Sequence, residues 1–328
     1  MASNENLLGP SPRARQAILD NIDEISSYPD SSCRDLRAAI GARLDVDPDN
    51  LFVGNGAVEI IYALCQAFLE RSDQVITGTP SFSAYTIGSQ IQDARVIAVP
   101  LVEDRFDVDG LRAAVTDETK IVFVANPNNP TGSIIGIADI ARLLKFLPAS
   151  VILLLDEAYA EFVADPSYHG SIDLVGAHPN LVILRTLSKS MGIAGLRVGY
   201  CVASKPVINT LIQVQVPFHV NVLAQKAALA ALDDDDHMAK TLAYLQEGKD
   251  YLYRELHRLR VSFVETHTNF LWIRTDVPAD DLFQRLVAAG CIVRPGTGFG
   301  CPFHCRVTIG LAWHNERFIK ALEHSLAD

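Results

Sequence analysis

The stretch Thr186–Tyr200 contains the residue type with the most evident capacity for covalent chemistry. Lys189 lies there between two serine hydroxyls, and the apolar run Leu181–Leu184 just before it predicts a buried strand. A lysine that follows a buried strand either extends into solvent or serves as an amine nucleophile, as Schiff-base lysines do. On this stretch alone, an exposed lysine in a glycine-rich turn is an equally good interpretation.

Polar residues also follow two other predicted strands. The run 121–124 leads into the Asn- and Pro-rich turn Ala125–Gly132, and the run 151–155 leads into Asp156 and Tyr159. The carboxyl ends of parallel strands meet at one edge of a sheet, where the sites of such proteins lie. A carboxylate that follows five aliphatic residues loses hydration unless a cation or a donor meets it. The alternative for Asp156 is a helix cap.

A glycine turn, Gly54–Gly56, joins a predicted strand over 51–53 to a predicted helix over 57–64. Free backbone N–H groups and the positive end of the helix dipole make such a turn suitable for binding a phosphate. For this short motif by itself, an ordinary strand-to-helix turn is the better interpretation.

Short apolar runs alternate with helical segments through the first two thirds of the chain. The runs 75–76, 96–99, 121–124, 151–155 and 181–184 are continuous, which predicts strands buried on both faces. The fold class is therefore α/β, with a mostly parallel central sheet and helices on both sides. Further helices are expected over 12–20 and 34–44.

The character of the sequence changes after Pro217. A long helical segment over about 220–259 is interrupted by the acidic run Asp233–Asp236, which we interpret as a solvated turn or cap. Shorter strands (270–273 and 306–309) and helices (279–289 and 316–326) predict a smaller α+β domain. We expect an N-terminal segment over 1–26 that packs with this small domain, a large domain over 27–218 and the small domain over 219–328.

Composition and charge argue against several classes of protein. The 328 residues are 49% hydrophobic and 20% charged, as in ordinary globular proteins, and the net charge of -11 disfavours general nucleic-acid binding. Because no apolar run approaches the ~18 residues of a membrane helix and no signal peptide is evident, we expect a cytoplasmic protein without membrane contact. Six scattered cysteines indicate free thiols. Cys301, His304 and Cys305 lack a second cluster that would complete a metal site, so no metal is expected.

Together these motifs resemble those of the fold-type I aminotransferases that use pyridoxal 5′-phosphate, and most closely the histidinol-phosphate aminotransferase branch. The motifs run in order from the first residues to the last strand, so the resemblance covers nearly the whole chain. They are Ser3–Asn6 with Gly9–Pro12, Tyr28–Asp30, Gly54–Gly56, Asn126–Gly132, Asp156–Tyr159, Ser188–Lys189 with Gly195–Tyr200, Pro217–Phe218 and Arg306–Gly310. Each motif is moderately specific alone, and the complete ordered set is specific to the superfamily.

The resemblance implies a role for each polar strand end. Lys189 is the Schiff-base lysine, whose amine, once the substrate displaces it, can move a proton between the substrate Cα and the cofactor C4′. Asp156 is expected to pair with the pyridinium nitrogen, which keeps the ring an effective electron sink. Tyr159 and Asn129 are expected to hydrogen-bond the phenolic oxygen of the ring.

The resemblance also assigns residues to the ring face and to the phosphate of the cofactor. Phe82 matches the aromatic residue that stacks on the ring, with Tyr85 as a rival and core packing as the alternative. The phosphate is expected to lie against the backbone at a helix start, beside a hydroxyl and a guanidinium. These groups come from Gly56, Ala57, Val58, Ser188 and Arg197. The family often has Ser-Asp at positions 57–58, so side-chain contacts to the phosphate are lost here.

Substrate and partner residues follow from the same resemblance. Arg306 matches the arginine that binds the anionic group of the substrate, Arg294 matches a second one in this branch, and Asn129 lies near the substrate. A guanidinium suits phosphate and carboxylate equally. The pair can therefore serve both histidinol phosphate, which has no α-carboxylate, and 2-oxoglutarate or glutamate. Tyr28 matches a tyrosine that reaches the phosphate from the neighbouring subunit, so a homodimer with shared sites is implied.

Other functions remain open at this stage. An aromatic or broad-range aminotransferase would use the same residues on a different amine. A decarboxylase similar to the enzymes that act on threonine phosphate would keep the cofactor and release carbon dioxide. A cofactor-binding module without activity has no fused DNA-binding segment in its favour. A nicotinamide-dependent dehydrogenase is disfavoured because no G-x-G-x-x-G motif opens the first helix.

Overall fold

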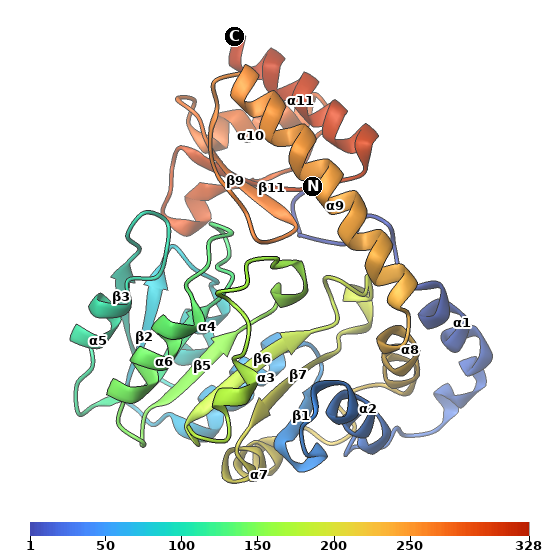
Figure 1. The fold of residues 1–328 in the computed structure, drawn as a ribbon, viewed down its shortest axis with the longest axis vertical. Helices are drawn as coiled ribbons and strands as arrows, with labels where there is room; N and C mark the ends of the chain where they lie inside the picture. Colours follow the sequence, from blue (N-terminus) through green and yellow to red (C-terminus); the bar gives the residue numbers. More distant parts are fainter. Residues whose placement is uncertain (328) are drawn as a thin grey trace.

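The computed structural model describes residues 1–327 and divides into two units joined by one long helix (Figure 1). The centre of the larger unit is a seven-stranded sheet in the order β1-β7-β6-β5-β4-β2-β3. Its strands are β1 (Leu51–Gly54), β2 (Gln74–Thr79), β3 (Arg95–Pro100), β4 (Thr119–Ala125), β5 (Ile152–Asp156), β6 (Leu181–Thr186) and β7 (Gly199–Ala203). Six strands share one direction and β7 runs against both of its neighbours, which confirms the mostly parallel sheet.

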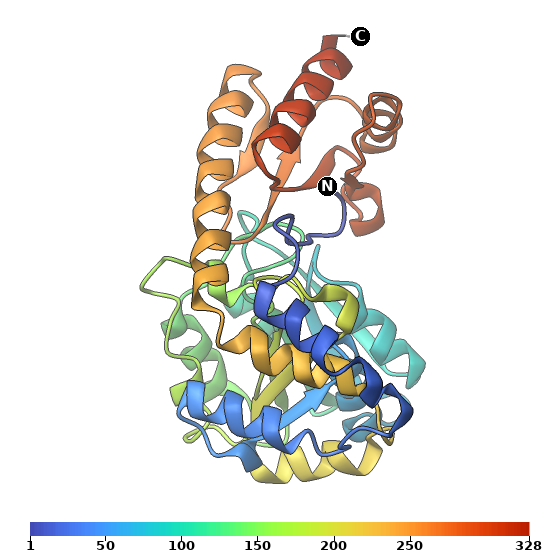
Figure 2. The ribbon, with the colours of Figure 1, turned by 90° about the vertical axis from the view of Figure 1, so that its right-hand side faces the viewer.

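Eight α-helices surround this sheet. They are α1 (Pro12–Asp20), α2 (Arg34–Leu44), α3 (Ala57–Phe68), α4 (Ala84–Ile91), α5 (Val108–Ala113), α6 (Ile137–Phe146), α7 (Lys205–Val214) and α8 (Val222–Leu232). Helix α3 packs against α4 and α7, whereas α5 packs against α6. The view in Figure 2 shows these groups on opposite sides of the sheet. Because both faces are covered, the central strands β4, β5 and β6 are almost wholly buried.

Two strands differ from expectation. β3 lies at the edge of the sheet, so most of its residues are partly or fully exposed, and the prediction of burial on both faces is wrong for it. β7 was not predicted, because Gly199 and Tyr200 continue the glycine-rich stretch after Lys189 and the strand signal is short. Its antiparallel pairing with β6 turns the loop between them back across the edge of the sheet. Lys189 lies in this loop.

The smaller unit contains a four-stranded antiparallel sheet in the order β10-β11-β9-β8. Its elements are α9 (Asp235–Arg258), β8 (Ser262–Val264), β9 (Phe270–Arg274), α10 (Ala279–Ala288), β10 (Arg294–Pro295), β11 (His304–Thr308) and α11 (Ala312–Ala327). The strands and helices predicted here are confirmed. Short 3-10 helices complete the fold at η1 (Ile22–Ser26), η2 (Pro48–Asn50), η3 (Ala160–Phe162), η4 (Ile172–Leu174), η5 (Ala194–Leu196) and η6 (Gly296–Phe299).

Helix α9 begins at the acidic run, which does form a turn between two helices. Asp234, however, is buried, so the interpretation of the whole run as solvated is wrong for this residue. Its carboxylate caps α9 by accepting from the His237 N–H at 3.2 Å, and it accepts from the Ser11 hydroxyl at 2.6 Å. Hydrogen bonds of this kind hold its pKa below the usual range despite burial. The turn thereby ties the start of α1 to the start of α9.

Each of the two units has its own hydrophobic core. The larger core extends from Ala14 in α1 to Leu232 at the end of α8, whereas the smaller core joins Tyr159 and Phe162 to residues from Leu245 to Leu322, with Met1 packed against it. The first residues thus contact the smaller unit while α1 packs with the larger one, against α8. The domain boundaries at 26 and 218 stay a prediction. No helix within residues 1–327 is both long enough and apolar enough to cross a membrane.

Candidate active site

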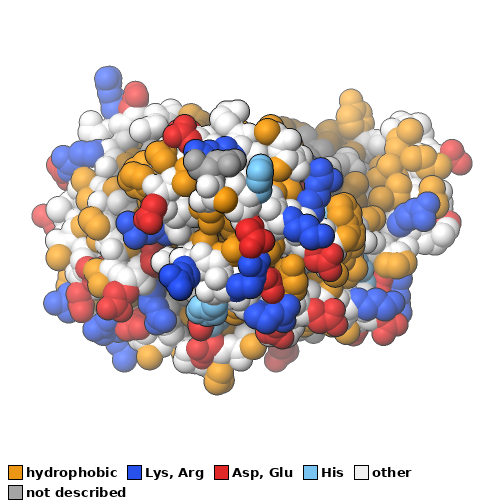
Figure 3. Space-filling view, turned by 90° about the horizontal axis from the view of Figure 1, so that it is seen from above, with side chains coloured by type: hydrophobic (Ala, Val, Ile, Leu, Met, Phe, Trp, Pro, Cys, Tyr) orange, Lys and Arg blue, Asp and Glu red, His pale blue; other side chains and the backbone are white. Residues whose placement is uncertain are grey.

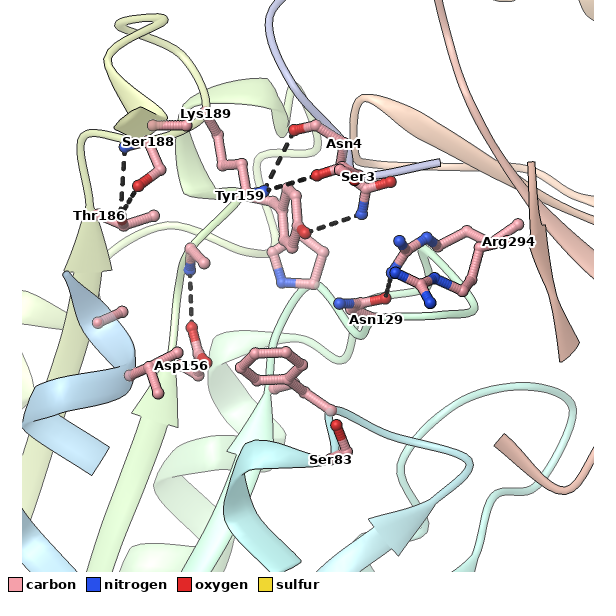
Figure 4. Close-up of a pocket in the computed structure, with 18 of the residues that line it drawn as sticks. Ser3, Asn4, Ser83, Asn129, Asp156, Tyr159, Thr186, Ser188, Lys189 and Arg294 are labelled. Atoms are coloured by element: carbon pink, nitrogen blue, oxygen red, sulfur yellow. Dashed lines mark hydrogen bonds between the residues drawn. The ribbon is translucent and has the colours of Figure 1, made fainter. Parts of the chain in front are cut away.

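A cavity of about 500 Å³ opens where the carboxyl ends of β4, β5 and β6 face the smaller unit. This size is typical of a small-molecule site. Each of the three strands contributes its last residue to the lining, namely Ala125, Asp156 and Thr186. The parallel strands therefore deliver the separate sequence motifs to one place, as the position of the polar strand ends predicted. Figure 4 shows the lining residues around this space.

Most of the residues expected at a site come together in this cavity. The lining includes Ala57, Val58, Phe82, Asn129, Asp156, Tyr159, Ser188, Lys189, Arg197, Arg294 and Arg306. Gly56 lies just outside the lining. Tyr28 is 83% exposed and stacks on Phe218 with ring centroids 4.5 Å apart, away from the cavity of its own chain. A role for Tyr28 in a neighbouring subunit stays a prediction.

Lys189 extends from the β6–β7 loop into the upper part of the cavity (Figure 4). Its amine donates to the carbonyl oxygens of Ser3 at 3.3 Å and Asn4 at 3.2 Å, and lies 5.7 Å from the centre of the Tyr159 ring. The sequence left open whether Lys189 is an exposed lysine in a turn or an amine nucleophile. The contacts favour the nucleophile, because the lysine is half-buried inside a cavity rather than extended into solvent.

Asp156 lies at the floor of the cavity and is buried. Its carboxylate accepts from the Tyr85 hydroxyl at 2.6 Å and from the Ala158 N–H at 3.0 Å. Loss of hydration raises the pKa of Asp156 to about 6, although both hydrogen bonds oppose the shift. The Asp156 carboxylate is suited to accept a hydrogen bond from a cationic N–H. Such a partner would replace the hydration that burial has removed.

The neighbouring carboxylate, Glu157, points the other way. It accepts two hydrogen bonds from the Arg185 guanidinium, at 2.8 Å and 3.0 Å. Successive side chains of an extended segment alternate between its two sides, so one carboxylate faces the cavity and the other forms a buried ion pair. The resemblance assigned Asp156 to the site, and the structure shows that Glu157 is instead paired with Arg185.

The structure also separates the two aromatic candidates. Phe82 is half-buried and lines the cavity, and its ring meets that of Tyr85 edge-on at 5.7 Å. Tyr85 is fully buried and stacks on Phe123, and its hydroxyl is occupied by Asp156. Of these two residues, Phe82 is therefore the better placed to cover a flat ring in the cavity. Tyr85 contributes instead by holding Asp156.

One end of the cavity is shaped for an anion. Gly56 has a φ of 82°, a conformation favoured by glycine, and a Cβ at this position would overlap the guanidinium of Arg197. The N-terminus of α3 follows at Ala57, with Val58 beside it in the lining. Ser188 adds a hydroxyl that is held by Thr186 at 2.9 Å. Backbone N–H groups, a hydroxyl and a guanidinium make this end suitable for a phosphate.

Arg306 lies at the opposite side, on β11 of the smaller unit. It is buried, donates to Asn129 Oδ1 at 2.5 Å and to the Ala2 carbonyl at 2.6 Å, and its Nε has no hydrogen-bond partner within residues 1–327. Burial lowers the pKa of Arg306. Arg294 on β10 is paired in register with Arg306 and is exposed at the rim. This arrangement places a guanidinium with unused donor capacity beside a second one, as needed to bind an anionic ligand.

Two features of the site were missed from the sequence. Ser3 and Asn4 line the cavity and accept from Lys189, yet they were only part of a motif without an assigned role. Tyr85 was considered for the ring face rather than as the partner of Asp156. Neither relation has a local sequence signal, because the partners lie 185 and 71 positions apart.

Cys301, His304 and Cys305 do not form a cluster. Cys305 is buried, Cys301 is half-buried, and both are free thiols, while the His304 ring stacks on Trp272. Within residues 1–327, no three His, Cys, Asp or Glu side chains gather in a way that could hold a metal ion.

Comparison with known proteins places this cavity in a family. The family described as "Aminotransferase class I and II" matches residues 1–322. A histidinol-phosphate aminotransferase of Moorella thermoacetica is 44% identical over 328 residues, which cover 100% of this chain and 85% of that protein. A second one, from Carboxydothermus hydrogenoformans, is 39% identical and covers 98% of this chain and 90% of that protein.

Solved structures agree with these relatives. The histidinol-phosphate aminotransferase of Sinorhizobium meliloti, in complex with pyridoxal-5′-phosphate, has a TM-score of 0.94 at 25% identity and covers 99% of this chain and 90% of that one. The L-threonine-O-3-phosphate decarboxylase of Porphyromonas gingivalis has a TM-score of 0.89 at 25% identity, with 100% and 99% of the two chains covered. On the sequence match and the arrangement of the cavity, this chain belongs to the class I and II aminotransferases.

Proposed function

We propose that this protein is a pyridoxal-phosphate-dependent transaminase that transfers the amino group of L-histidinol phosphate to 2-oxoglutarate. The products are imidazole acetol phosphate and glutamate. The observation that carries the proposal is the convergence of Lys189, Asp156 and Arg306 on one cavity, between a phosphate-shaped end and a pair of arginines. Relatives named histidinol-phosphate aminotransferases, matched over the full chain, support the choice of amine.

The residues present fit the cofactor. Gly56 lets the Arg197 guanidinium approach the start of α3, where a Cβ would overlap it, and the cavity floor offers a buried carboxylate that lacks a cation. Gly56, Ala57, Val58, Ser188 and Arg197 would hold the phosphate, Asp156 the ring nitrogen, Asn129 and Tyr159 the phenolic oxygen, and Phe82 the ring face. When bound, the cofactor supplies an electron sink for the electrons of the substrate Cα–H bond.

The chain's own groups bind, orient and move protons. Lys189, held by two backbone carbonyls, is within the cavity and can take the proton from Cα and return it elsewhere as a general base and acid. Arg306, with its unused Nε, can bind the carboxylate of glutamate or the phosphate of histidinol phosphate as a bidentate donor. Burial of Arg306 excludes water from its side chain and strengthens its interaction with an anion.

A substitution at Lys189 tests the class of reaction. Lys189→Ala is expected to abolish the covalent attachment of the cofactor, seen as loss of its absorbance change on reduction with borohydride, and to abolish turnover. Lys240→Ala, at an exposed position on α9, is the matched control and should behave as the unchanged protein. A Lys189→Ala variant that still binds the cofactor covalently would contradict the proposal.

A panel of amines tests the substrate. Histidinol phosphate, phenylalanine, tyrosine and O-phosphothreonine are each mixed with the loaded protein, and the conversion of the cofactor to its amine form is followed by absorbance. Fast conversion by histidinol phosphate, with glutamate formed from 2-oxoglutarate, is the expected result. Faster conversion by the aromatic amino acids would identify an aromatic aminotransferase. Release of carbon dioxide without use of the keto acid would identify a decarboxylase, the alternative favoured by the structural likeness to the Porphyromonas gingivalis enzyme.

We further propose a homodimer with shared sites. Proteins of this family are generally dimeric, and Tyr28 is exposed on the surface of its own chain next to other apolar residues. A tyrosine at 83% exposure has little to stabilise its ring apart from Phe218, so a partner subunit is a natural acceptor for it.

A further inference from the structure

Asn4 is a buried residue of the N-terminal segment that contacts both halves of the site. It is 1% exposed and has a φ of 55°, a conformation that asparagine tolerates better than most residues. Its carbonyl oxygen accepts from the Lys189 amine at 3.2 Å and from Asn269 Nδ2 at 3.0 Å. Its side chain lies between Thr308 of the smaller unit and Tyr159 of the larger one.

One orientation of the Asn4 amide provides an acceptor for the hydroxyl proton of Thr308. The Asn4 backbone N–H can only donate, and it donates to Thr308 Oγ1 at 3.0 Å. The hydroxyl of Thr308 therefore accepts there, and its own proton is donated to Asn4 Oδ1 at 3.3 Å. In the flipped amide, Nδ2 would donate to the second lone pair of Thr308 Oγ1, and the Thr308 proton would have no acceptor within residues 1–327, so the orientation with Oδ1 toward Thr308 is favoured. The nitrogen end, Nδ2, then faces the Tyr159 hydroxyl at 3.0 Å (Figure 4).

This direction decides what the Tyr159 hydroxyl can do. An amide nitrogen donates and cannot accept, so the phenolic oxygen accepts from Asn4 and its proton must be used elsewhere. No other hydrogen bond of this hydroxyl is found within residues 1–327, and Tyr159 lines the cavity. The proton is thus available to a ligand in the cavity.

We propose that Asn4 is a positioning residue that keeps the Tyr159 hydroxyl a donor toward the cavity, with Thr308 fixing the orientation of the Asn4 amide. The inference deepens the proposed function and rests on it, because the acceptor of the proton would be the phenolic oxygen of the cofactor. The hydrogen bonds from Thr308 through Asn4 to Tyr159 would also connect the phenolic oxygen of the cofactor to β11 of the smaller unit. The titratable groups that face Tyr159 are Lys189 from the β6–β7 loop, Asp156 from β5, Tyr85 from α4 and Arg306 from β11.

Asn4→Asp reverses the direction at nearly constant shape. A carboxylate can only accept, so it would draw the Tyr159 proton away from the cofactor, and the absorbance change of the bound cofactor should titrate at higher pH. The new charge shifts this titration too, so the same substitution is made in a Tyr159→Phe background, where the charge remains and the hydroxyl is missing. Asn4→Asp is expected to shift the midpoint of the absorbance titration by about one pH unit more when Tyr159 is present than in the Tyr159→Phe background. This difference corresponds to the free energy of one hydrogen bond.

A pair of variants at Thr308 tests the second half of the proposal without a change of charge. Thr308→Val keeps the shape but cannot fix the amide, and should move the titration in the same direction as Asn4→Asp. Thr308→Ser keeps the hydroxyl, so the midpoint of its absorbance titration should equal that of the unchanged protein. The cofactor dissociation constant is measured in parallel.

The outcomes separate this inference from the proposed function. If the unchanged protein binds no pyridoxal phosphate at all, the proposed function fails. If the cofactor binds, but Asn4→Asp shifts the titration equally in the Tyr159 and Tyr159→Phe backgrounds, the role of Asn4 is overturned. If Thr308→Val and Thr308→Ser titrate alike, the role of Thr308 is overturned.

Discussion

Asp156 brings a carboxylate to the end of a strand whose other residues are aliphatic and buried. With one hydroxyl and one N–H as partners, it is under-compensated as an anion, and its pKa rises to about 6 because burial removes hydration. The buried Asp156 carboxylate destabilises the protein without the cofactor, and a cationic ring nitrogen would compensate its charge. This difference favours binding of the cofactor. The residue is thus poorly suited to stability alone and well suited to binding.

The first prediction concerns the pH dependence of the cofactor-free protein. Because the folded-state pKa of Asp156 lies above its usual value of 3.8, the folded chain holds the proton more tightly. Stability therefore falls as pH rises from about 4 to about 6 and stays low above this range. Asp156→Asn removes this loss, so it should raise the free energy of unfolding by up to roughly 3 kcal/mol at pH 7.5 and by much less at pH 4.5.

Denaturant unfolding at both pH values measures this effect. Asp117→Asn, at an exposed position, is the matched control and should show no such pH dependence. An equal gain for Asp156→Asn at pH 4.5 and pH 7.5 would show that burial of the charge is not the cause.

The second prediction concerns Arg306. Arg306→Lys keeps the charge but loses the planar fork and the bond to Asn129, so the KM for glutamate and for histidinol phosphate should rise roughly 10- to 100-fold. Steady-state kinetics with both substrates provide the measurement. Arg274→Lys, on the neighbouring strand β9 and outside the cavity lining, should leave both KM values within a few fold. Unchanged KM values in Arg306→Lys would remove this residue from the substrate site.

At the scale of elements, the β1–α3 turn and the β6–β7 loop meet at the end of the cavity that we propose binds the cofactor phosphate. The turn brings backbone N–H groups to the start of α3, while the loop brings Ser188 and Arg197 to face them. Their approach depends on Gly56, because its φ of 82° and the nearby guanidinium leave no space for a side chain. The Gly54–Gly56 turn and the loop with Ser188 and Arg197 are each weakly specific as sequence motifs. Their close contact in the structure combines them into one candidate phosphate site.

The third prediction follows from this contact. Gly56→Ala should be strained by about 1–3 kcal/mol in backbone conformation and should push Arg197 aside, so the dissociation constant of the cofactor rises by roughly tenfold or more. Gly195→Ala, at a position with open space, is the control and should bind the cofactor normally. Equilibrium binding followed by fluorescence distinguishes them, and equal constants for the two variants would contradict the assignment of the phosphate end.

At the scale of the whole molecule, apolar side chains are exposed around the segment from α1 to Tyr28. Leu19, Ile22, Ile25, Val216 and Phe218 are each between 44% and 64% exposed there. Figure 3 shows charges of both signs spread over the face above the smaller unit, with hydrophobic side chains at the end where α1 lies in Figure 1. A concentration of this kind is typical of a surface that another subunit covers.

The fourth prediction tests this surface. Ile25→Glu places a charge in it and should shift the protein toward the monomer in sedimentation velocity experiments, with loss of activity because Tyr28 leaves the neighbouring site. Val102→Glu, at a similarly exposed apolar position after β3, should leave the mass unchanged. A monomeric unchanged protein with full activity would overturn the proposal of shared sites.

The sequence by itself predicted the class of fold and most of the candidate site residues that line the cavity. Continuous apolar runs predict buried strands whatever their order, and the residues after them, Asp156 and Lys189 among others, must then lie at one edge of a parallel sheet. These inferences depend on local periodicity and on motif order, both of which can be read along the chain. The exposed β3 and the unpredicted β7 mark their limit, since position within a sheet is not a local property.

Only the tertiary structure decided which groups contact one another. It showed that Glu157 pairs with Arg185, that Tyr85 holds Asp156, and that Asn4 lies against Tyr159. Each of these relations joins side chains from distant segments, and its hydrogen-bond direction depends on all the partners present at once. For that reason a lysine in a glycine-rich turn could be singled out from the sequence, but its surroundings could not.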